Sequence, residues 1–202
     1  MIELVQRGGV IIVLIILLSV VGVAIIIERL LYFRKNQGDE NTIMKRLEAT
    51  LAKGNFDEAL AICETMPCPI TNLMKVGIDH REYSREVIKM AISDAANMEI
   101  PQMERFLSTL GTIAHITPLL GLLGTVTGNI QAFGVLGQTG IGTGDPAILA
   151  GGISEALLTT AAGIIVAIPA IAFYNYLVSR VNHSIIRLEN RVNELVLYLR
   201  KE

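Results

Sequence analysis

Charged residues and cysteines are scarce in this 202-residue chain, and their scarcity excludes several classes of protein. Lysine and arginine number 17 against 19 aspartate and glutamate residues, so a net charge of −2 gives no reason to expect a nucleic-acid surface. Disorder needs low hydrophobicity with high net charge, and a disulfide scaffold needs many cysteines. Neither applies, because 51% of the residues are apolar and only two are cysteine.

Motifs for enzyme chemistry are also missing from the sequence. Residues 137–144 contain a G-x-G pattern, but no strand is predicted before them and no Gly-Lys-Ser/Thr follows. There is no Ser/His/Asp order, paired Asp motif or H-E-x-x-H sequence. Cys63 and Cys68 have no histidine nearer than His80, so we interpret them as free thiols rather than a zinc site. The sequence therefore predicts neither an enzyme nor a bound metal or cofactor.

Three long apolar runs take the place of such motifs. Residues 10–27 carry no charge and only Ser19 as a polar side chain, which is about the length that crosses a hydrocarbon core. Arg29 and other charged residues follow, as in a stop-transfer flank, whereas a signal peptide would end at a small-residue cleavage site. The other two runs lie at about 106–133 and 146–178. The predicted fold class is an all-α integral membrane protein whose three transmembrane helices extend into a cytoplasmic helical bundle.

The distribution of lysine and arginine predicts the orientation of these spans. Ten lie between residues 34 and 105 and five after residue 178, but only Arg7 precedes the first span. By the positive-inside rule the N-terminus lies outside, and the large polar segment and its reduced cysteines are cytoplasmic. The expected organisation is a short external N-terminus (1–9), a first span (10–33), a cytoplasmic helical domain (34–105), a second span (106–133), an external Gly-rich hairpin (134–145), a third span (146–178) and a cytoplasmic amphipathic helix (179–202).

The polar segment is predicted to be helical. Residues 41–52 favour one helix, and a second is expected after Gly54, with Asn55 as its N-cap. A third stretch begins at Ser84, keeps apolar residues at helical spacing and runs toward the second span.

Two ionisable residues fall inside the predicted spans. Glu155 lies nine residues after Pro146, roughly 14 Å along a helix that rises 1.5 Å per residue. Because hydrocarbon disfavours charge, Glu155 indicates a carboxyl beside an ion path, although a carboxyl that hydrogen-bonds a neighbouring helix also fits. Glu155 and Thr159 share a helix face, whereas Thr160 is turned about 140° away, so the three need not line one cavity. His115 is interpreted as a packing residue.

Small and hydroxyl-bearing residues cluster in the second and third spans. The spacing Gly124-x-x-x-Gly128 permits close approach of two helix backbones, and Thr125 lies within it. Thr159 and Thr160 lie beside further small residues on the third span. Threonine hydroxyls would give protons or water a hydrogen-bonded lining, and tight helix packing alone also explains the pattern. The candidate pore-lining or helix-packing residues are Gly121, Gly124, Gly128, Thr159 and Gly163.

These residues carry a resemblance to the MotA/TolQ/ExbB family of proton-channel subunits. The second span has ITPLLGLLGTV at 116–126, and the third has GISEALLTTA at 152–161 and AIPA at 167–170. The likeness is close over about 107–178. Three spans with an external N-terminus resemble the ExbB/TolQ branch, since the MotA-type stators of this family have four.

The resemblance implies a homopentamer that encloses two copies of a single-span partner similar to ExbD or TolR, which supplies a membrane Asp. Proton flow across the bacterial inner membrane would then act on a TonB/TolA-like protein. By family motif, Thr125 and Thr160 face that Asp, Glu155 belongs to the functional set, and Pro169 joins the pore-lining or packing set. An ExbB-like subunit of a TonB-type transport system is the first expectation. A TolQ-like envelope-maintenance subunit, a scaffold without ion conduction and coupling to sodium stay open.

Overall fold

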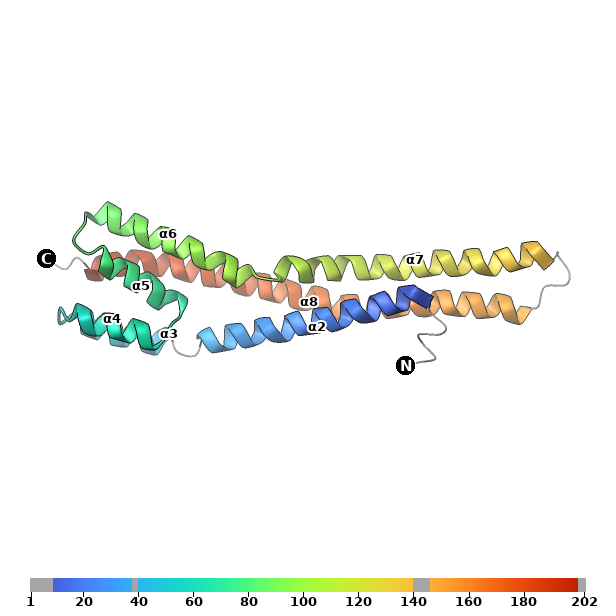
Figure 1. Cartoon of the computed structure of the whole chain (residues 1–202), viewed down its shortest axis with the longest axis horizontal. Coiled ribbons are helices and arrows are strands. Elements are labelled where there is room, and N and C mark those ends of the chain that lie inside the picture. Colours follow the sequence, from blue (N-terminus) through green and yellow to red (C-terminus); the bar gives the residue numbers. More distant parts are fainter. Residues whose placement is uncertain (1–8, 38–39, 140–145, 200–202) are drawn as a thin grey trace. The chain divides into compact units, whose positions relative to one another are not determined.

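The computed structural model describes residues 9–37, 40–139 and 146–199, and within these ranges every regular element is an α-helix. Three stretches are long and apolar enough to cross a membrane: Gly9–Arg34, Arg85–Gly134 and Leu149–Arg191. The expected fold class, an all-α membrane protein with three spanning helices, is confirmed. The helices, drawn in Figure 1, are α2 (Gly9–Gln37), α3 (Glu40–Leu51), α4 (Phe56–Thr65), α5 (Pro69–Asp79), α6 (Arg85–Glu104), α7 (Leu107–Thr139) and α8 (Pro146–Leu199).

Two of the expected connections fall partly outside the described residues. Helix α7 continues to Thr139, so the first residues of the expected hairpin 134–145 are helical, and residues 140–145 lie outside the described ranges. Residues 1–8 of the expected external N-terminus also lie outside them. The chain divides into two compact units, Met1–Glu28 with Phe106–Tyr176, and Arg29–Arg105 with Leu177–Glu202.

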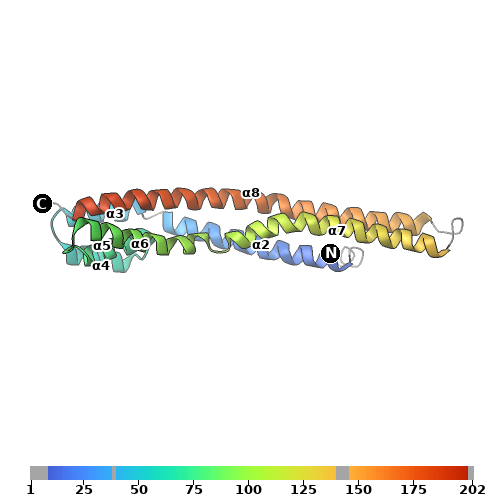
Figure 2. The same ribbon diagram turned by 90° about the horizontal axis from the view of Figure 1, so that it is seen from above.

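The first unit is an apolar bundle of α7, the first part of α8 and most of α2. Helices α7 and α8 lie side by side, as Figures 1 and 2 both show. They are antiparallel, because Gly121 lies against Thr160 whereas Gly128, further along α7, lies against Ala156. Much of the outer surface consists of exposed aliphatic side chains such as Leu119, a surface suited to hydrocarbon or to other membrane helices rather than to water.

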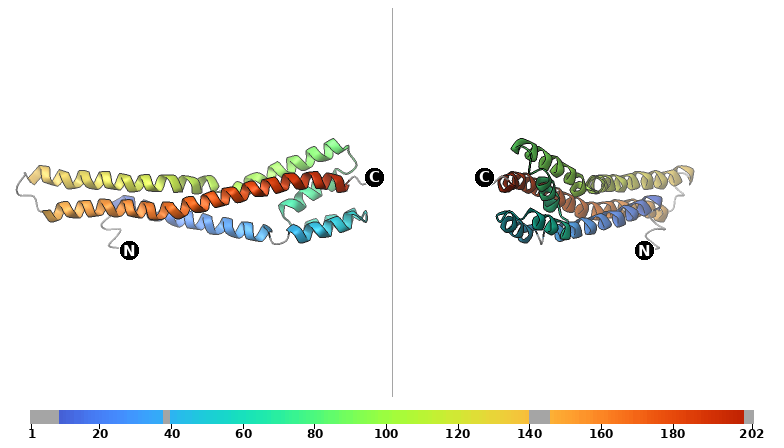
Figure 3. Two further views of the ribbon diagram at one scale, coloured as in Figure 1. Left: turned by 180° about the vertical axis from the view of Figure 1, so that it is seen from behind. Right: turned by 60° about the vertical axis from the view of Figure 1, so that its left-hand side comes forward.

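The second unit contains α3 to α6 and the end of α8 (Figure 3). Helix α5 packs against both α4 and α6, and α4 packs against α3. Its core is formed by side chains that are almost fully removed from water, including Leu47, Met74 and Ile92. Gly54, the expected stop, has a φ of +77°, a left-handed conformation that glycine adopts without strain, and its N–H donates to the carbonyl of Leu51.

The start of α5 is fixed by Cys68 and Thr71. The Cys68 N–H donates to Thr71 Oγ1 at 2.8 Å, and the Thr71 backbone N–H points back to the Cys68 side chain, which gives a reciprocal cap beside Pro69. Both cysteines are free thiols. Burial, and to a lesser extent nearby Cys68, raises the pKa of the Cys63 thiol from 9.0 to about 11, so Cys63 keeps its proton at neutral pH.

A buried arginine joins the end of α2 to the end of α6. Arg29 is only 2% exposed, and its Nη1 donates to the carbonyls of Gln102 at 2.8 Å and Met103 at 3.5 Å. These carbonyls belong to the last turn of α6, where no helical N–H remains to bond them and where the helix dipole attracts a cation. The chain then breaks at Phe106, whose φ is +63°. Arg29, one of the charged residues that follow the first apolar run, is therefore a buried helix cap.

Candidate functional site

Small residues line the contact between α7 and α8. We define the α7–α8 seam as Gly121, Gly124 and Gly128 of α7 with Gly152, Ala156, Thr159, Thr160 and Gly163 of α8. A Cβ atom at Gly121 would lie 3.1 Å from Thr160 Cα, and one at Gly163 would lie 2.8 Å from the carbonyl oxygen of Thr117. These obstacles are backbone atoms that no side-chain rotation can move. Glycine is thus required for the helices to approach this closely.

The middle of the seam places Thr159 against Gly124. A Cβ at Gly124 would lie 2.6 Å from Thr159 Cβ, and one at Gly128 would lie 2.9 Å from Ala156 Cβ. Thr159 is 2% exposed, and its hydroxyl donates to the Ala156 carbonyl of its own helix at 2.7 Å. Thr159 therefore fills the space that Gly124 leaves open, with its polar atom satisfied inside α8.

Thr160 joins the two helices by a hydrogen bond. Its Oγ1 donates to the Gly121 carbonyl of α7 at 3.0 Å, although that carbonyl belongs to a helix interior. The side chain is partly exposed, so its hydroxyl oxygen can still accept a hydrogen bond from another group. Thr160 therefore places a hydroxyl at the edge of an otherwise apolar helix contact.

Thr117 and Thr125 of α7 are hydrogen-bonded within their own helix. Thr125 is partly exposed, and its hydroxyl donates to the Leu122 carbonyl at 2.6 Å. Thr117 is fully buried, and its hydroxyl donates to the Ile113 carbonyl at 2.5 Å. Each bond uses only the hydroxyl hydrogen, so the oxygen of the partly exposed Thr125 can still accept a hydrogen bond, whereas that of Thr117 is buried.

Glu155 and Pro169 lie away from the seam. Glu155 is half-buried, and its Oε1 lies 3.9 Å from the position of a Cβ at Gly9, at the first residue of α2. Pro169 is exposed in the middle of α8, which continues through it without interruption. The structure thus brings Thr160 and the seam glycines together, leaves Thr125 at the flank, and places Glu155 near α2.

A contact that sequence reasoning missed lies between Gly111 and Tyr174. A Cβ at Gly111 would lie 2.9 Å from Tyr174 Cε2, so this glycine makes room for an aromatic ring. The Gly111 carbonyl also lies 2.6 Å from His115 Nδ1, one turn along the same helix. His115 is exposed and has a hydrogen-bond partner within α7. The only sequence signal for this contact was Gly111 itself, a glycine inside an apolar run, and a glycine does not indicate which residue packs against it.

The chemistry that this arrangement offers is limited to oxygen atoms in apolar surroundings. Threonine hydroxyls and one carboxyl can stabilise a proton or a transient charge without a permanent cation nearby. Over the ranges that the structure describes, no three His, Cys, Asp or Glu side chains are grouped so that they could hold a metal ion. The site is therefore a candidate for ion passage or for binding a membrane helix.

Known proteins that are similar to this chain include ExbB and TolQ proteins. Residues 66–190 match the sequence model of the MotA/TolQ/ExbB proton channel family. A biopolymer transport protein ExbB homolog of Methanothermobacter thermautotrophicus is 31% identical over 188 residues, which are 93% of this chain and 66% of that protein. The Tol-Pal system protein TolQ of Haemophilus influenzae is 38% identical over 112 residues, 55% of this chain and 48% of TolQ. ExbB of Neisseria meningitidis is 29% identical over 179 residues, 82% of this chain and 79% of that protein.

Proposed function

Because the chain belongs to the MotA/TolQ/ExbB proton channel family, we propose that it is the channel-forming subunit of a membrane motor driven by the proton-motive force. In this proposal five copies surround two copies of an ExbD/TolR-like single-span protein in a bacterial inner membrane. The N-terminus lies outside and the polar unit lies in the cytoplasm. The machine energises a TonB-type transport system through a TonB/TolA-like protein.

The observation that carries the proposal is the hydroxyl of Thr160 at the edge of the α7–α8 seam. A partner Asp that alternately binds and releases a proton needs a polar lining when it is charged. Thr160 can supply this lining by turning its hydroxyl from the Gly121 carbonyl toward the carboxylate. Thr125 can do the same from Leu122. Neither threonine adds a fixed charge. The protonated, neutral Asp is therefore not destabilised beside them and can move away from them.

Glu155 has a separate role in this mechanism. It lies on α8 near the start of α2, not in the seam with Thr160. A half-buried carboxyl in an apolar helix is a group that can hold a proton as it enters or leaves. We therefore assign Thr125 and Thr160 to the passage of the proton and Glu155 to its entrance. Gly121, Gly124, Gly128, Thr159, Gly163 and Pro169 shape the helices around the passage.

A TolQ-like role in envelope maintenance is the second candidate, favoured by the similarity to TolQ of Haemophilus influenzae. It uses the same ion-driven mechanism, so it differs in the partner protein and not in the seam. A scaffold that does not conduct ions would not need the hydroxyl of Thr160, so its function would survive the loss of that hydroxyl. Variants at the seam therefore separate a channel from a scaffold.

The test is proton uptake by right-side-out membrane vesicles that contain the chain and its natural partners, placed in an acidified medium and followed with a pH-sensitive dye inside the vesicles. Thr160→Val removes the hydroxyl and keeps the shape, whereas Thr160→Ser retains the hydroxyl. A hydrogen bond to a charged group is worth about 1.5–3 kcal/mol, so Thr160→Val should slow uptake by about tenfold or more. Thr160→Ser should retain most of it. Thr127→Val is the matched control, because Thr127 is turned about 160° around α7 from Thr125 and its hydroxyl donates to the Leu123 and Gly124 carbonyls of its own helix.

Uptake in Thr160→Val or Glu155→Ala vesicles at the wild-type rate would contradict the channel and favour the scaffold. The coupling ion is identified in the same vesicles by changing the sodium gradient at fixed pH. A response to sodium alone would replace the proton by sodium without changing the role of the threonine hydroxyls.

A further inference from the structure

An exposed apolar stripe runs along one side of α6. We define the α6 stripe as Val87, Met90 and Met98, of which Met90 is 62% and Met98 is 77% exposed. The opposite side of the helix buries Ile88 and Ile92 completely. Charged residues recur along α6, so hydrocarbon is not the natural cover for this stripe. Exposed methionines at helical spacing are typical of adaptable protein contacts.

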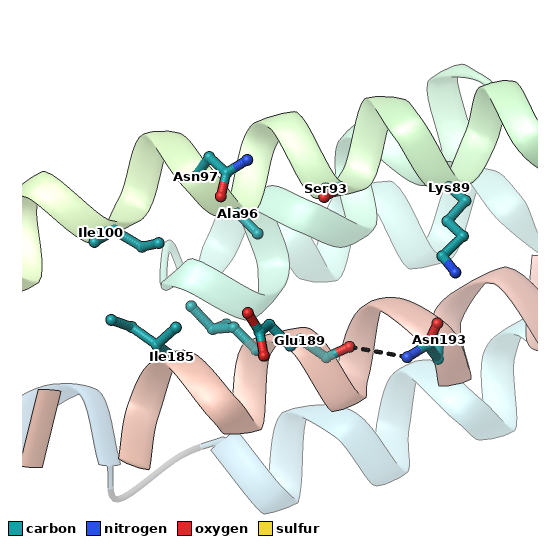
Figure 4. Close-up of a pocket in the computed structure, with 9 residues that line it drawn as sticks. Lys89, Ser93, Ala96, Asn97, Ile100, Ile185, Glu189 and Asn193 are labelled. Atoms are coloured by element: carbon teal, nitrogen blue, oxygen red, sulfur yellow. Dashed lines mark hydrogen bonds between the residues drawn. The ribbon is translucent and has the colours of Figure 1, made fainter. Parts of the chain in front are cut away.

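A groove lies on another side of α6, where it faces α8 (Figure 4). Its volume is about 210 Å³, and a second hollow that shares Lys89 and Asn193 continues it toward Arg85 and Val196. The lining combines apolar side chains, such as Ile100 and Ile185, with the polar side chains of Lys89 and Asn193, which suits a helix that is apolar on one face and charged beside it. The α6–α8 groove is defined by Lys89, Ser93, Ala96, Asn97 and Ile100 of α6 and by Ile185, Leu188, Glu189 and Asn193 of α8.

Asp94 beside the stripe and Lys89 in the groove have opposite charges, and neither has an ion-pair partner among the described residues. Asp94 is exposed on α6, one turn from each of the two stripe methionines. Lys89 extends from α6 into the groove toward Asn193, as Figure 4 shows. The groove also holds Glu189, on the wall formed by α8.

We propose that the α6 stripe of one copy of this chain docks in the α6–α8 groove of the next copy, with Asp94 directed toward Lys89. This inference rests on the proposed function, because it assigns a contact within the proposed ring. The two surfaces are different and lie on different sides of one helix, so each copy offers a stripe to one neighbour and a groove to the other. A head-to-tail contact of this kind closes into a ring when its rotation allows. The stripe and the groove both extend about 16 Å along α6.

Disulfide crosslinking between two populations of the chain tests the contact. Cys63→Ala and Cys68→Ser remove the natural thiols. One tagged population then carries Met98→Cys on the stripe, and a differently tagged population carries Ser93→Cys in the groove, because these positions lie one turn further along α6 than Asp94 and Lys89. Co-expression and mild oxidation in native membranes should give a crosslinked product with both tags. Met98→Cys with Asp57→Cys, an exposed position of α4, is the matched control and should give at least fivefold less product.

Charge reversal gives a second readout that does not depend on cysteine. Asp94→Lys and Lys89→Asp should each lower the assembled fraction by about twofold to fivefold per contact, the size of an exposed ion pair, and the double variant should recover it. A ring that forms normally without the Met98–Ser93 crosslink, or without recovery in the double variant, would overturn this contact and leave the proposed function intact. Absence of any ring would overturn both.

Discussion

The seam between α7 and α8 predicts that a single methyl group at Gly152 destabilises the chain, whereas the same methyl one residue earlier does not. A Cβ at Gly152 would lie 2.9 Å from Ala132 Cβ, well inside the 3.5–4.0 Å at which two carbon atoms attract. Gly151, its neighbour in α8, has no atom within 4 Å of its Cβ position. Comparing Gly152→Ala with Gly151→Ala therefore separates the effect of the contact with Ala132 from the general effect of replacing glycine by alanine in a helix.

The magnitude follows from two opposing terms. Overpacking by one methyl group costs typically about 1–3 kcal/mol, because both helices must shift. Alanine is favoured over glycine inside a helix by about 1 kcal/mol, and this gain is the same at both positions. Gly152→Ala should therefore be about 1–3 kcal/mol less stable than Gly151→Ala. For a chain of this size each kcal/mol lowers the Tm by about 2–4 °C.

A reciprocal variant sharpens the test. With Ala132→Gly added to Gly152→Ala, the methyl group moves from α7 to α8, and the nearest remaining atoms, Ala132 Cα and the Gly128 carbonyl oxygen, lie at an ordinary 3.5 Å. The double variant should regain most of the lost stability. Thermal unfolding of the purified chain in detergent, followed by circular dichroism, measures all four proteins. Equal Tm values for Gly151→Ala and Gly152→Ala, or no recovery in the double variant, would refute the register of the seam.

Two further predictions concern the polar unit. Arg29→Met leaves buried carbonyls of α6 without a donor and should cost about 2–4 kcal/mol in chemical unfolding, whereas Arg34→Met, at an exposed position of the same helix, should stay within about 0.5 kcal/mol; equal losses would contradict the cap. The raised pKa of Cys63 contributes stability that is complete below pH 9 and is lost as the pH rises through about 11. In a Cys68→Ser background, iodoacetamide should therefore label Cys63 slowly at pH 8 and faster toward pH 11, and rapid labelling at pH 8 would show that this thiol is not buried.

The three spans could be predicted because length and apolar composition alone decide whether a helix can cross a membrane. Gly121 and Gly124 could also be recognised in the sequence, because close approach of a second helix is the main reason for glycine inside an apolar helix. The residues that face these glycines could not be predicted. Thr159 and Thr160 are adjacent in sequence, and only the register of α8 decides which of the two hydroxyls reaches α7.

Arg29 shows the limit of reading a sequence locally. An arginine after an apolar run has the same pattern whether it extends into water or turns into the protein. What distinguishes the two is the last turn of α6, which lies more than 70 residues away and whose Gln102 carbonyl lacks a helical donor. The break at Phe106 was likewise not predicted, because its left-handed φ is rare for an aromatic residue and has no sequence signal.

Native mass spectrometry of the chain, extracted from its own membranes with lipids retained, tests the central claim most directly. A proton path built from the hydroxyls of Thr125 and Thr160 works only if the chain assembles around a second protein that carries the proton. The predicted result is five copies of this chain with a copurifying single-span protein that has an Asp within its span. A monomer, or an assembly without any such partner after the mildest extraction that preserves activity, would contradict the claim.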